Sequence, residues 1–296
     1  MNWDDLKVFL AVARAESLSG AGRGLKIDPA TVGRRVSRLE EKLAAPLFAK
    51  SQLGYALTDA GQRLMVHAER AEQAMQSATE ELAGQAGGLS GQIRIGAPDG
   101  CANYLLPQVC ARISQNNPDL ELQIVALPRV FNLSKREADL AIGVSPPAAG
   151  RLTVQKITDY RLHLAAHEDY LANCAPLIRL EDLKGHQMVG YIPDMIFDKE
   201  LDYLSECGVE RVPLASNSVS VQFNWIRQAG GIGIVHDFAI PSTTGLRKIL
   251  EDQLSLTRSF YLIRHSDDRR LDRLSRFAKE LSEGIRAEVT RLEAMC

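Results

Sequence analysis

The sequence lacks the cysteine patterns and apolar runs that mark secreted and membrane proteins. Its cysteines lie far apart, without a Cys-x-x-Cys pair, at positions Cys101, Cys110, Cys174, Cys207 and Cys296. Such usage is typical of a reducing compartment and not of a disulfide or zinc framework. No apolar run approaches the roughly 18 to 20 residues that span a bilayer, and the acidic start of the chain is unlike a signal peptide. We therefore expect a soluble, cytoplasmic protein with no membrane contact.

The chain also lacks the motifs of common enzyme classes. Neither Gly-x-Ser-x-Gly nor His-Glu-x-x-His occurs, and the six histidines are dispersed along the sequence. His163 and His167 are four residues apart, but His163 falls in a predicted strand, so the two do not form a helical metal pair. Gly20-x-Gly22-x-Gly24 has no preceding strand and no following Gly-Lys-Ser/Thr, which argues against a nucleotide site. We expect no catalytic activity, no metal and no cofactor.

Charge is nearly balanced over the whole chain but not locally. The formal net charge of −2 argues against general binding of polyanions. Between positions 23 and 50, however, basic residues exceed acidic ones, with Lys or Arg at 23, 26, 34, 35, 38, 42 and 50 and acids only at 28, 40 and 41. A local basic excess in a slightly acidic chain favours a dedicated nucleic-acid-binding segment.

Residues 28–43 form the most strongly marked predicted helix in this basic segment. Asp28 is a candidate N-cap and Pro29 takes the first helical position, where its missing N–H is harmless. An apolar stripe of helical period predicts one buried face, made of Val32, Val36, Leu39 and Leu43. The opposite face carries Thr31 and three arginines, which is the build of a helix that reads the major groove.

The flanking segments predict the layout of a helix-turn-helix with a wing. Asn2 and Ser17 are candidate N-caps of two preceding helices, the first ending near Glu16. Pro46 ends the arginine-bearing helix, and residues 50–58 are interpreted as two short strands around Gly54. The run from Leu6-x-x-Phe9-Leu10 through Ala30-x-Val32-x-Arg34 and Arg38-Leu39-Glu40 to Leu57-Thr58-x-Ala60-Gly61 resembles the winged helix-turn-helix of LysR-type transcriptional regulators.

This resemblance implies an all-α winged helix-turn-helix domain at residues 1–58 that binds double-stranded DNA at a near-palindromic operator. We predict that its DNA contacts come from the head and outer face of the helix and from the wing, at Pro29, Ala30, Thr31, Arg34, Arg35, Arg38 and Lys50. Contact with RNA polymerase is compatible with this function.

Residues 59–87 predict a long linker helix that follows the candidate N-cap Thr58. Apolar residues recur at spacings of four, three, four, three and four, typical of a two-stranded coiled-coil seam, at Leu64, Ala68, Ala71, Met75, Ala78 and Leu82. A helix packed on its own domain is the alternative. We favour dimerisation because a helix-turn-helix reads both halves of a near-palindromic site only as a dimer. The family resemblance extends this expectation to a homodimer or homotetramer.

The glycine-rich run at 84–91 predicts a hinge, after which strands and helices alternate. Alternation of this kind argues for a parallel α/β sheet in residues 88–296. The region resembles the two-lobed, type II periplasmic-binding-protein-like effector domain of the same family. That resemblance implies a first lobe of about 91–160 and 264–296, a second lobe of about 161–263, and crossover strands near 152–161 and 258–264.

In such sheets, ligands bind beyond the carboxyl ends of strands, where the lobes meet. We therefore predict a small-molecule effector in the cleft, contacted by Asp99, Gly100, Cys101, Ala102, Asn103, Pro128, Arg129, Tyr191, Asn217, Ser218 and His236. Asp99 and Arg129 carry opposite charges that could meet a zwitterion or an organic acid. The sequence thus predicts an effector-controlled, sequence-specific transcription regulator. A thiol-based redox sensor of the same fold is the alternative, because Cys101 falls in the predicted cleft.

Overall fold

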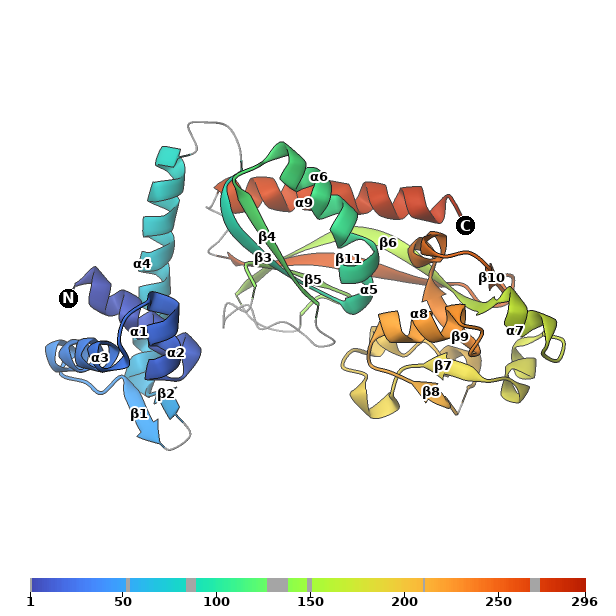
Figure 1. Cartoon of the computed structure of the whole chain (residues 1–296), viewed down its shortest axis with the longest axis horizontal. Helices are drawn as coiled ribbons and strands as arrows, with labels where there is room; N and C mark the ends of the chain where they lie inside the picture. Colours follow the sequence, from blue (N-terminus) through green and yellow to red (C-terminus); the bar gives the residue numbers. More distant parts are fainter. Residues whose placement is uncertain are drawn as a thin grey trace. The chain divides into compact units, whose positions relative to one another are not determined.

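The computed structural model of the chain describes residues 2–51, 54–83, 89–126, 138–147, 151–209, 211–266 and 272–296. The chain divides into two compact units, Met1–Gly87 and Gly88–Cys296 (Figure 1). Each unit has its own hydrophobic core.

The first unit contains helices and a two-stranded wing. Its elements in order are α1 (Trp3–Ala15), α2 (Leu18–Leu25), α3 (Pro29–Leu43), β1 (Phe48–Ser51), β2 (Gly54–Leu57) and α4 (Asp59–Ala83). The predicted caps are confirmed. Asn2 Oδ1 accepts from the Asp4 amide at 3.2 Å, Ser17 Oγ from the Gly20 amide at 2.9 Å, and Asp28 Oδ2 from the Ala30 amide at 2.9 Å.

The core of the first unit is formed by the apolar faces of α1 and α3 and by the chain that follows them. Val32, Val36 and Leu39 are buried, as their spacing predicts, whereas Leu43 is 39% exposed at the end of the helix. The wing joins this core at Gly54, whose φ is +128° and whose missing Cβ would lie 2.5 Å from the Glu16 carbonyl oxygen. That close approach lets the Tyr55 amide donate to Glu16 at 2.9 Å, so the position requires glycine.

Helix α4 packs its first half on its own unit. Thr58 caps the helix as predicted, because its Oγ1 accepts from the Gly61 amide at 3.1 Å. Ala68 is 1% exposed in the core, Leu64 and Ala71 pack against that core, and Arg14 on α1 pairs with Glu72 at 2.6 Å. The prediction that Ala68 lies in a dimer seam is therefore wrong, because the seam spacing also suits packing on α1. The side chains of Ala78 and Leu82 lie outside the described residues.

The second unit is built on a nine-stranded mixed sheet with strand order β4-β3-β5-β11-β6-β9-β7-β8 and with β10 paired to β6. Its strands are β3 (Gly91–Ala97), β4 (Leu120–Ala126), β5 (Leu140–Gly143), β6 (Leu152–His167), β7 (Met188–Gly190), β8 (Leu214–Ala215), β9 (Ile232–His236), β10 (Leu246–Lys248) and β11 (Leu256–His265). Its helices are α5 (Asp99–Tyr104), α6 (Leu106–Asn116), α7 (Glu168–Ala172), α8 (Val219–Arg227) and α9 (Asp272–Glu293).

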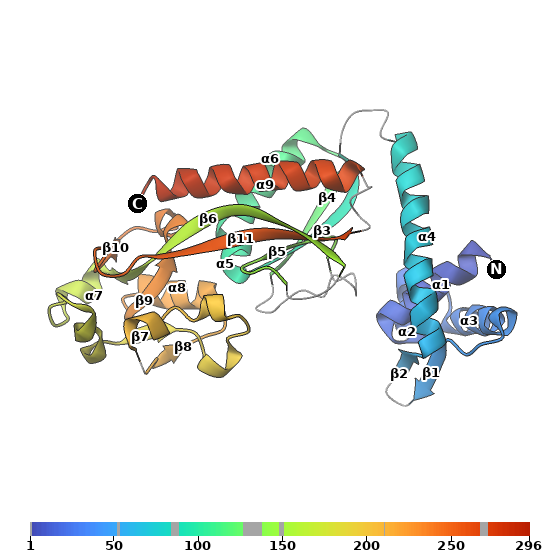
Figure 2. The same ribbon diagram turned by 180° about the vertical axis from the view of Figure 1, so that it is seen from behind.

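The expectation of a parallel sheet is only partly correct. Strands β3, β4 and β5 pair in parallel at one end of the unit, and β7, β8 and β9 pair in parallel at the other. Between them, β6 and β11 run antiparallel to each other along the unit and join the two lobes (Figures 1 and 2). The predicted crossover at 152–161 and the predicted strand at 162–166 are one continuous strand, β6, whose final part is buried on both faces.

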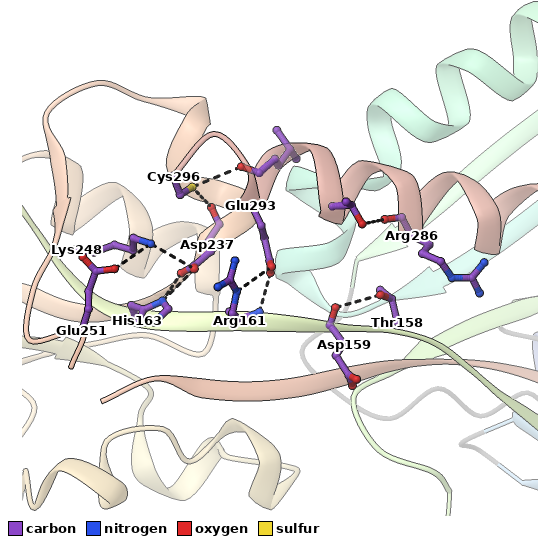
Figure 3. Close-up of polar contacts among 12 residues, drawn as sticks. Thr158, Asp159, Arg161, His163, Asp237, Lys248, Glu251, Arg286, Glu293 and Cys296 are labelled. Carbon is purple, nitrogen blue, oxygen red and sulfur yellow. Dashed lines mark hydrogen bonds and ion pairs between the residues drawn. The ribbon is translucent and has the colours of Figure 1, made fainter. Parts of the chain in front are cut away.

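Helix α9 lies along β6 and packs against α6 (Figure 2). Its buried face is made of Leu274, Phe277, Ala278, Leu281, Ile285, Val289 and Leu292. Polar contacts fix its last turns to the strand, since Arg286 donates to the Ile157 carbonyl. Glu293 also accepts from Arg161 (Figure 3). Beyond the helix, the Cys296 thiol donates to the Asp237 carbonyl at 3.1 Å.

Asp237 forms a buried ion cluster near this end of the chain (Figure 3). Its carboxylate is 0% exposed. It lies 2.8 Å from His163 Nδ1, within hydrogen-bond distance, and 3.8 Å from the positively charged Lys248 Nζ. Lys248 also pairs with Glu251 at 3.1 Å. His163 therefore serves the packing of β6 against the segment after β9, and it lies outside the predicted cleft residues.

Candidate nucleic-acid interface and effector cleft

The head and outer face of α3 present the predicted DNA-binding residues in different ways. Pro29, Ala30 and Arg34 are exposed, and Thr31 is half-buried. An Arg34 guanidinium nitrogen donates to Thr31 Oγ1 at 3.0 Å. Within the part of the chain that the structure describes, Arg34 forms no ion pair, so its charge is available to a base edge or a phosphate.

Arg35 and Arg38 instead have acidic partners on α1. Arg35 lies 3.9 Å from Asp4. Arg38 forms two hydrogen bonds with the carboxylate of Asp5, which is 0% exposed and also lies 4.0 Å from Lys42. Hydrogen bonding to Asp5 raises the pKa of Arg38. The guanidinium of Arg38 therefore links α3 to α1. The sequence analysis did not predict this contact, because it placed Arg38 on the outward face of the helix.

The wing is positioned by a carboxylate of α3. Glu40 Oε1 accepts from the Leu47 amide at 2.7 Å and from the Phe48 amide at 3.2 Å, so it holds the start of β1. Phe48 packs on Phe9 with ring centroids 5.3 Å apart. Lys50 lies in β1, but its side chain is outside the described residues, so its predicted phosphate contact stays a prediction.

In the second unit, a cavity of about 20 Å³ lies between the two sets of parallel strands, beside β6 and β11. It is surrounded by α5, by the ends of β7 and β9, and by aromatic residues of β6 and β11. A volume of this size holds about one water molecule. The lobes are therefore closed on each other around the predicted cleft.

Six of the predicted effector contacts line this cavity: Asp99, Gly100, Cys101, Tyr191, Asn217 and His236. Ala102 is buried but does not line it, and Asn103 is exposed, with its amide donating to Asp99 Oδ1 at 3.1 Å. Ser218 caps α8 and contacts Asp99. Pro128 and Arg129 lie outside the described residues.

His236 is the central polar group of the cleft. It is 5% exposed at the end of β9, and its Nδ1 has no hydrogen-bond partner among the described residues. Its ring stacks on Tyr160 at 5.4 Å, and Gly100 fits beside it because a Cβ there would lie 3.1 Å from Cε1. Burial lowers the pKa of His236 to about 4, with nearby Asp99 opposing the shift. The imidazole is therefore neutral at pH 7 and can serve a ligand as a donor or an acceptor.

The Asp99 carboxylate links the two lobes. Its Oδ2 accepts from the Ser218 hydroxyl at 3.0 Å and from the Ser220 amide at 2.8 Å, both at the start of α8. A carboxylate at the first turn of a helix is favoured by the helix dipole. Asp99 thus already forms hydrogen bonds across the cleft. To bind the positive charge of a zwitterion, as predicted, it would have to release Ser218 and Ser220.

Sequence reasoning missed the aromatic wall of the cleft. Tyr160, Phe197, Tyr203 and Phe260 line the cavity, and the Tyr160 and Phe260 rings stack with centroids 4.2 Å apart. The hydroxyls of Tyr160 and Tyr203 are buried and interact with each other. Because both also line the cavity, they are further candidates for ligand contacts.

The cysteines near the cleft do not have the character of a redox sensor. Cys101 is fully buried, and burial raises the pKa of its thiol, as it raises that of Cys110 to about 11. A reactive cysteine needs a lowered pKa and access to solvent. All five cysteines are free in the structure.

Over the described ranges, no cluster of three or more His, Cys, Asp or Glu residues is arranged to hold a metal ion. The helices in the described part of the chain are also too short or too polar to cross a bilayer.

The fold and cleft together define a class of protein that joins a winged helix-turn-helix to a two-lobed α/β ligand-binding unit. Comparison with protein-family models agrees. The lysR family of bacterial regulatory helix-turn-helix proteins matches residues 3–62, and the LysR substrate binding domain matches residues 86–286. The chain belongs to the LysR family.

Individual relatives are distant. The HTH-type transcriptional regulator CrgA of Neisseria meningitidis is 28% identical over 190 residues, which cover 64% of this chain and 64% of that relative, less than two thirds of its length. A full-length OxyR variant from Pseudomonas aeruginosa superposes with a TM-score of 0.72 at 18% identity over 97% of this chain and 95% of that one. Full-length CbnR complexed with its target DNA gives 0.58 at 15% identity over 96% and 100%. At these identities, the structural likeness shows the fold alone.

Proposed function

We propose that this chain is a sequence-specific, DNA-binding transcription regulator in the cytoplasm that is controlled by a small-molecule effector. The observation that carries the proposal is the outer face of α3. Its head is exposed at Pro29 and Ala30, its Arg34 guanidinium has no acidic partner among the described residues, and Glu40 holds the wing beside it. Full-length CbnR, which has the same fold, is complexed with its target DNA, which supports DNA binding by this chain.

Selection from a pool of random-sequence duplexes tests the proposal without knowledge of the operator. The full chain is expected to enrich a motif with two-fold symmetry, because a dimer presents two reading heads to two half-sites. Enrichment of no motif would contradict sequence-specific binding. Enrichment of a single unrepeated half-site would contradict the dimer.

The effector is proposed to occupy the cleft around His236. Since the closed cavity has room for about one water molecule, ligand binding requires the lobes to separate or the aromatic wall to move. A ligand that binds the open form better shifts the population toward it and so changes the spacing of paired reading heads. Opening would break the Asp99 contacts to Ser218 and Ser220, which gives the two states different internal contacts.

A homodimer or homotetramer is proposed to form through the second half of α4. Because Ala68 is buried in its own unit, the seam begins near Met75, which is 54% exposed. We expect Met75→Glu to shift the chain toward monomers in sedimentation velocity, since it places a charge in an apolar contact. Val66→Glu is the matched control, because Val66 is 46% exposed on the same helix but lies off the stripe. Equal sedimentation of both variants and the parent would argue against the seam.

A further inference from the structure

A second, larger pocket lies within the second lobe and is separate from the cleft. Its volume is about 270 Å³. Its floor is the buried surface of β7 and β9, with Val189, Gly190 and Ile234, and one wall is Gln222 of α8. Pro193 and Ser205 line it and are exposed, so the pocket opens to solvent on their side.

The pocket and the cleft share a wall. Tyr191, Leu201 and Tyr203 line both cavities, and the rings of Tyr191 and Tyr203 meet edge to face at 6.0 Å. The remaining lining residues differ, because His236 and Asp99 line only the cleft. The two cavities are therefore neighbours that share these three side chains.

The pocket combines aliphatic and polar surface and has an acidic edge. Aliphatic side chains, including Ile196, Leu204, Val209 and Val212, share the lining with tyrosine, serine, glutamine and aspartate side chains. Among the described residues, no lysine, arginine or histidine lines it, whereas Asp202 does. Gln222 is held in place because its amide nitrogen donates to the Ser216 carbonyl at 2.7 Å. Such a surface favours an apolar body, accepts a neutral molecule or an amine, and disfavours an anion.

We propose that this pocket is a second small-molecule site, for a neutral or amine-bearing apolar ligand of about the size of a bicyclic aromatic ring. An apolar cavity of about 150 Å³ is large enough to bind benzene, so the larger volume here suits two fused rings. The site stands on its own lining residues and does not depend on DNA binding or on an effector in the cleft.

Indole, tryptamine and indole-3-acetate are probes of equal ring size and different charge. In calorimetric titrations of the full chain, indole and tryptamine are expected to bind saturably with one site, and indole-3-acetate at least tenfold more weakly. Val212→Phe, which fills the pocket, is expected to weaken indole binding at least tenfold. Val221→Phe is the matched control, because Val221 is 40% exposed on α8 and lines neither cavity.

If Val212→Phe fails to fold, a second variant with an expected gain in affinity for indole-3-acetate still tests the proposal. Asp202→Lys reverses the charge at the edge of the pocket, so it is expected to raise the affinity for indole-3-acetate and to lower that for tryptamine. Three outcomes would overturn the site: no saturable binding of indole to the parent chain, unchanged binding by a folded Val212→Phe variant, or unchanged charge preference in Asp202→Lys.

Discussion

Acidification from pH 6.5 to pH 4 is expected to lower the free energy of unfolding of the second unit by about 3 kcal/mol through His236 alone. The folded-state pKa of this histidine is lowered from 6.5 to about 4 because its imidazole is buried. The unfolded chain therefore binds the proton first as the pH falls. Each unit of difference in pKa corresponds to about 1.4 kcal/mol. The stabilising contribution is complete above pH 6.5 and is lost as the pH falls toward 4.

Urea titrations at a series of pH values check this expectation. Trp225 packs against the core of the second unit, whereas Trp3 packs against that of the first, so a Trp3→Phe background reports the second unit by fluorescence. His236→Gln cannot titrate, and the pH dependence of its unfolding free energy is expected to be flatter by this amount. All other titratable groups are common to both proteins, so their contributions cancel in the comparison. Identical slopes would show that His236 is not buried in its neutral form.

Arg38→Ala is expected to destabilise the first unit far more than Asp5→Asn. The Asp5 carboxylate is 0% exposed, whereas the Arg38 side chain is 49% exposed. Loss of Arg38 leaves a buried carboxylate with only Lys42, at 4.0 Å, to neutralise it. Loss of the Asp5 charge leaves an arginine that water can still solvate. Removing one partner of a buried pair is costly when the remaining charge stays buried.

Thermal unfolding of the single and double variants tests this asymmetry. The Asp5→Asn/Arg38→Ala chain is expected to be more stable than Arg38→Ala alone, because the unpaired buried charge is gone. Arg34→Ala is the control, since it removes an exposed arginine of the same helix without an acidic partner among the described residues. A melting temperature of Arg38→Ala equal to that of Arg34→Ala would contradict the structural role of the pair.

Local signals in the sequence predicted local structure well. The caps at Asn2, Ser17, Asp28 and Thr58 act within three residues of the amides that they bind, so the sequence alone determines them. The same proximity explains why the helix starts in the first unit were correct. The family resemblance supplied the two-lobed fold of the second unit, which periodicity alone did not define.

Contacts between distant residues were not predictable. Asp5 and Arg38 are 33 positions apart, and the sequence pattern predicted only an outward-facing arginine at position 38. The aromatic wall of the cleft depends on strand register, which sets Phe260 opposite Thr158 and stacks it on Tyr160. The apolar stripe of α4 is compatible with packing on its own domain and with a dimer seam, and burial of Ala68 assigns only the first half of the helix to its own domain. Tertiary packing, which the sequence does not show, determines each of these contacts.

The most direct test of the account is the affinity of the full chain for a duplex enriched by selection, measured for the parent, Arg34→Ala and Lys7→Ala over a range of salt concentrations. Lys7 is an exposed lysine on α1 and serves as a control for loss of one positive charge. We predict that Arg34→Ala weakens binding to the selected duplex by about tenfold or more, the cost of one lost base-edge contact, while Lys7→Ala binds like the parent. Parental affinity in Arg34→Ala would contradict the assignment of α3 as the helix that reads DNA.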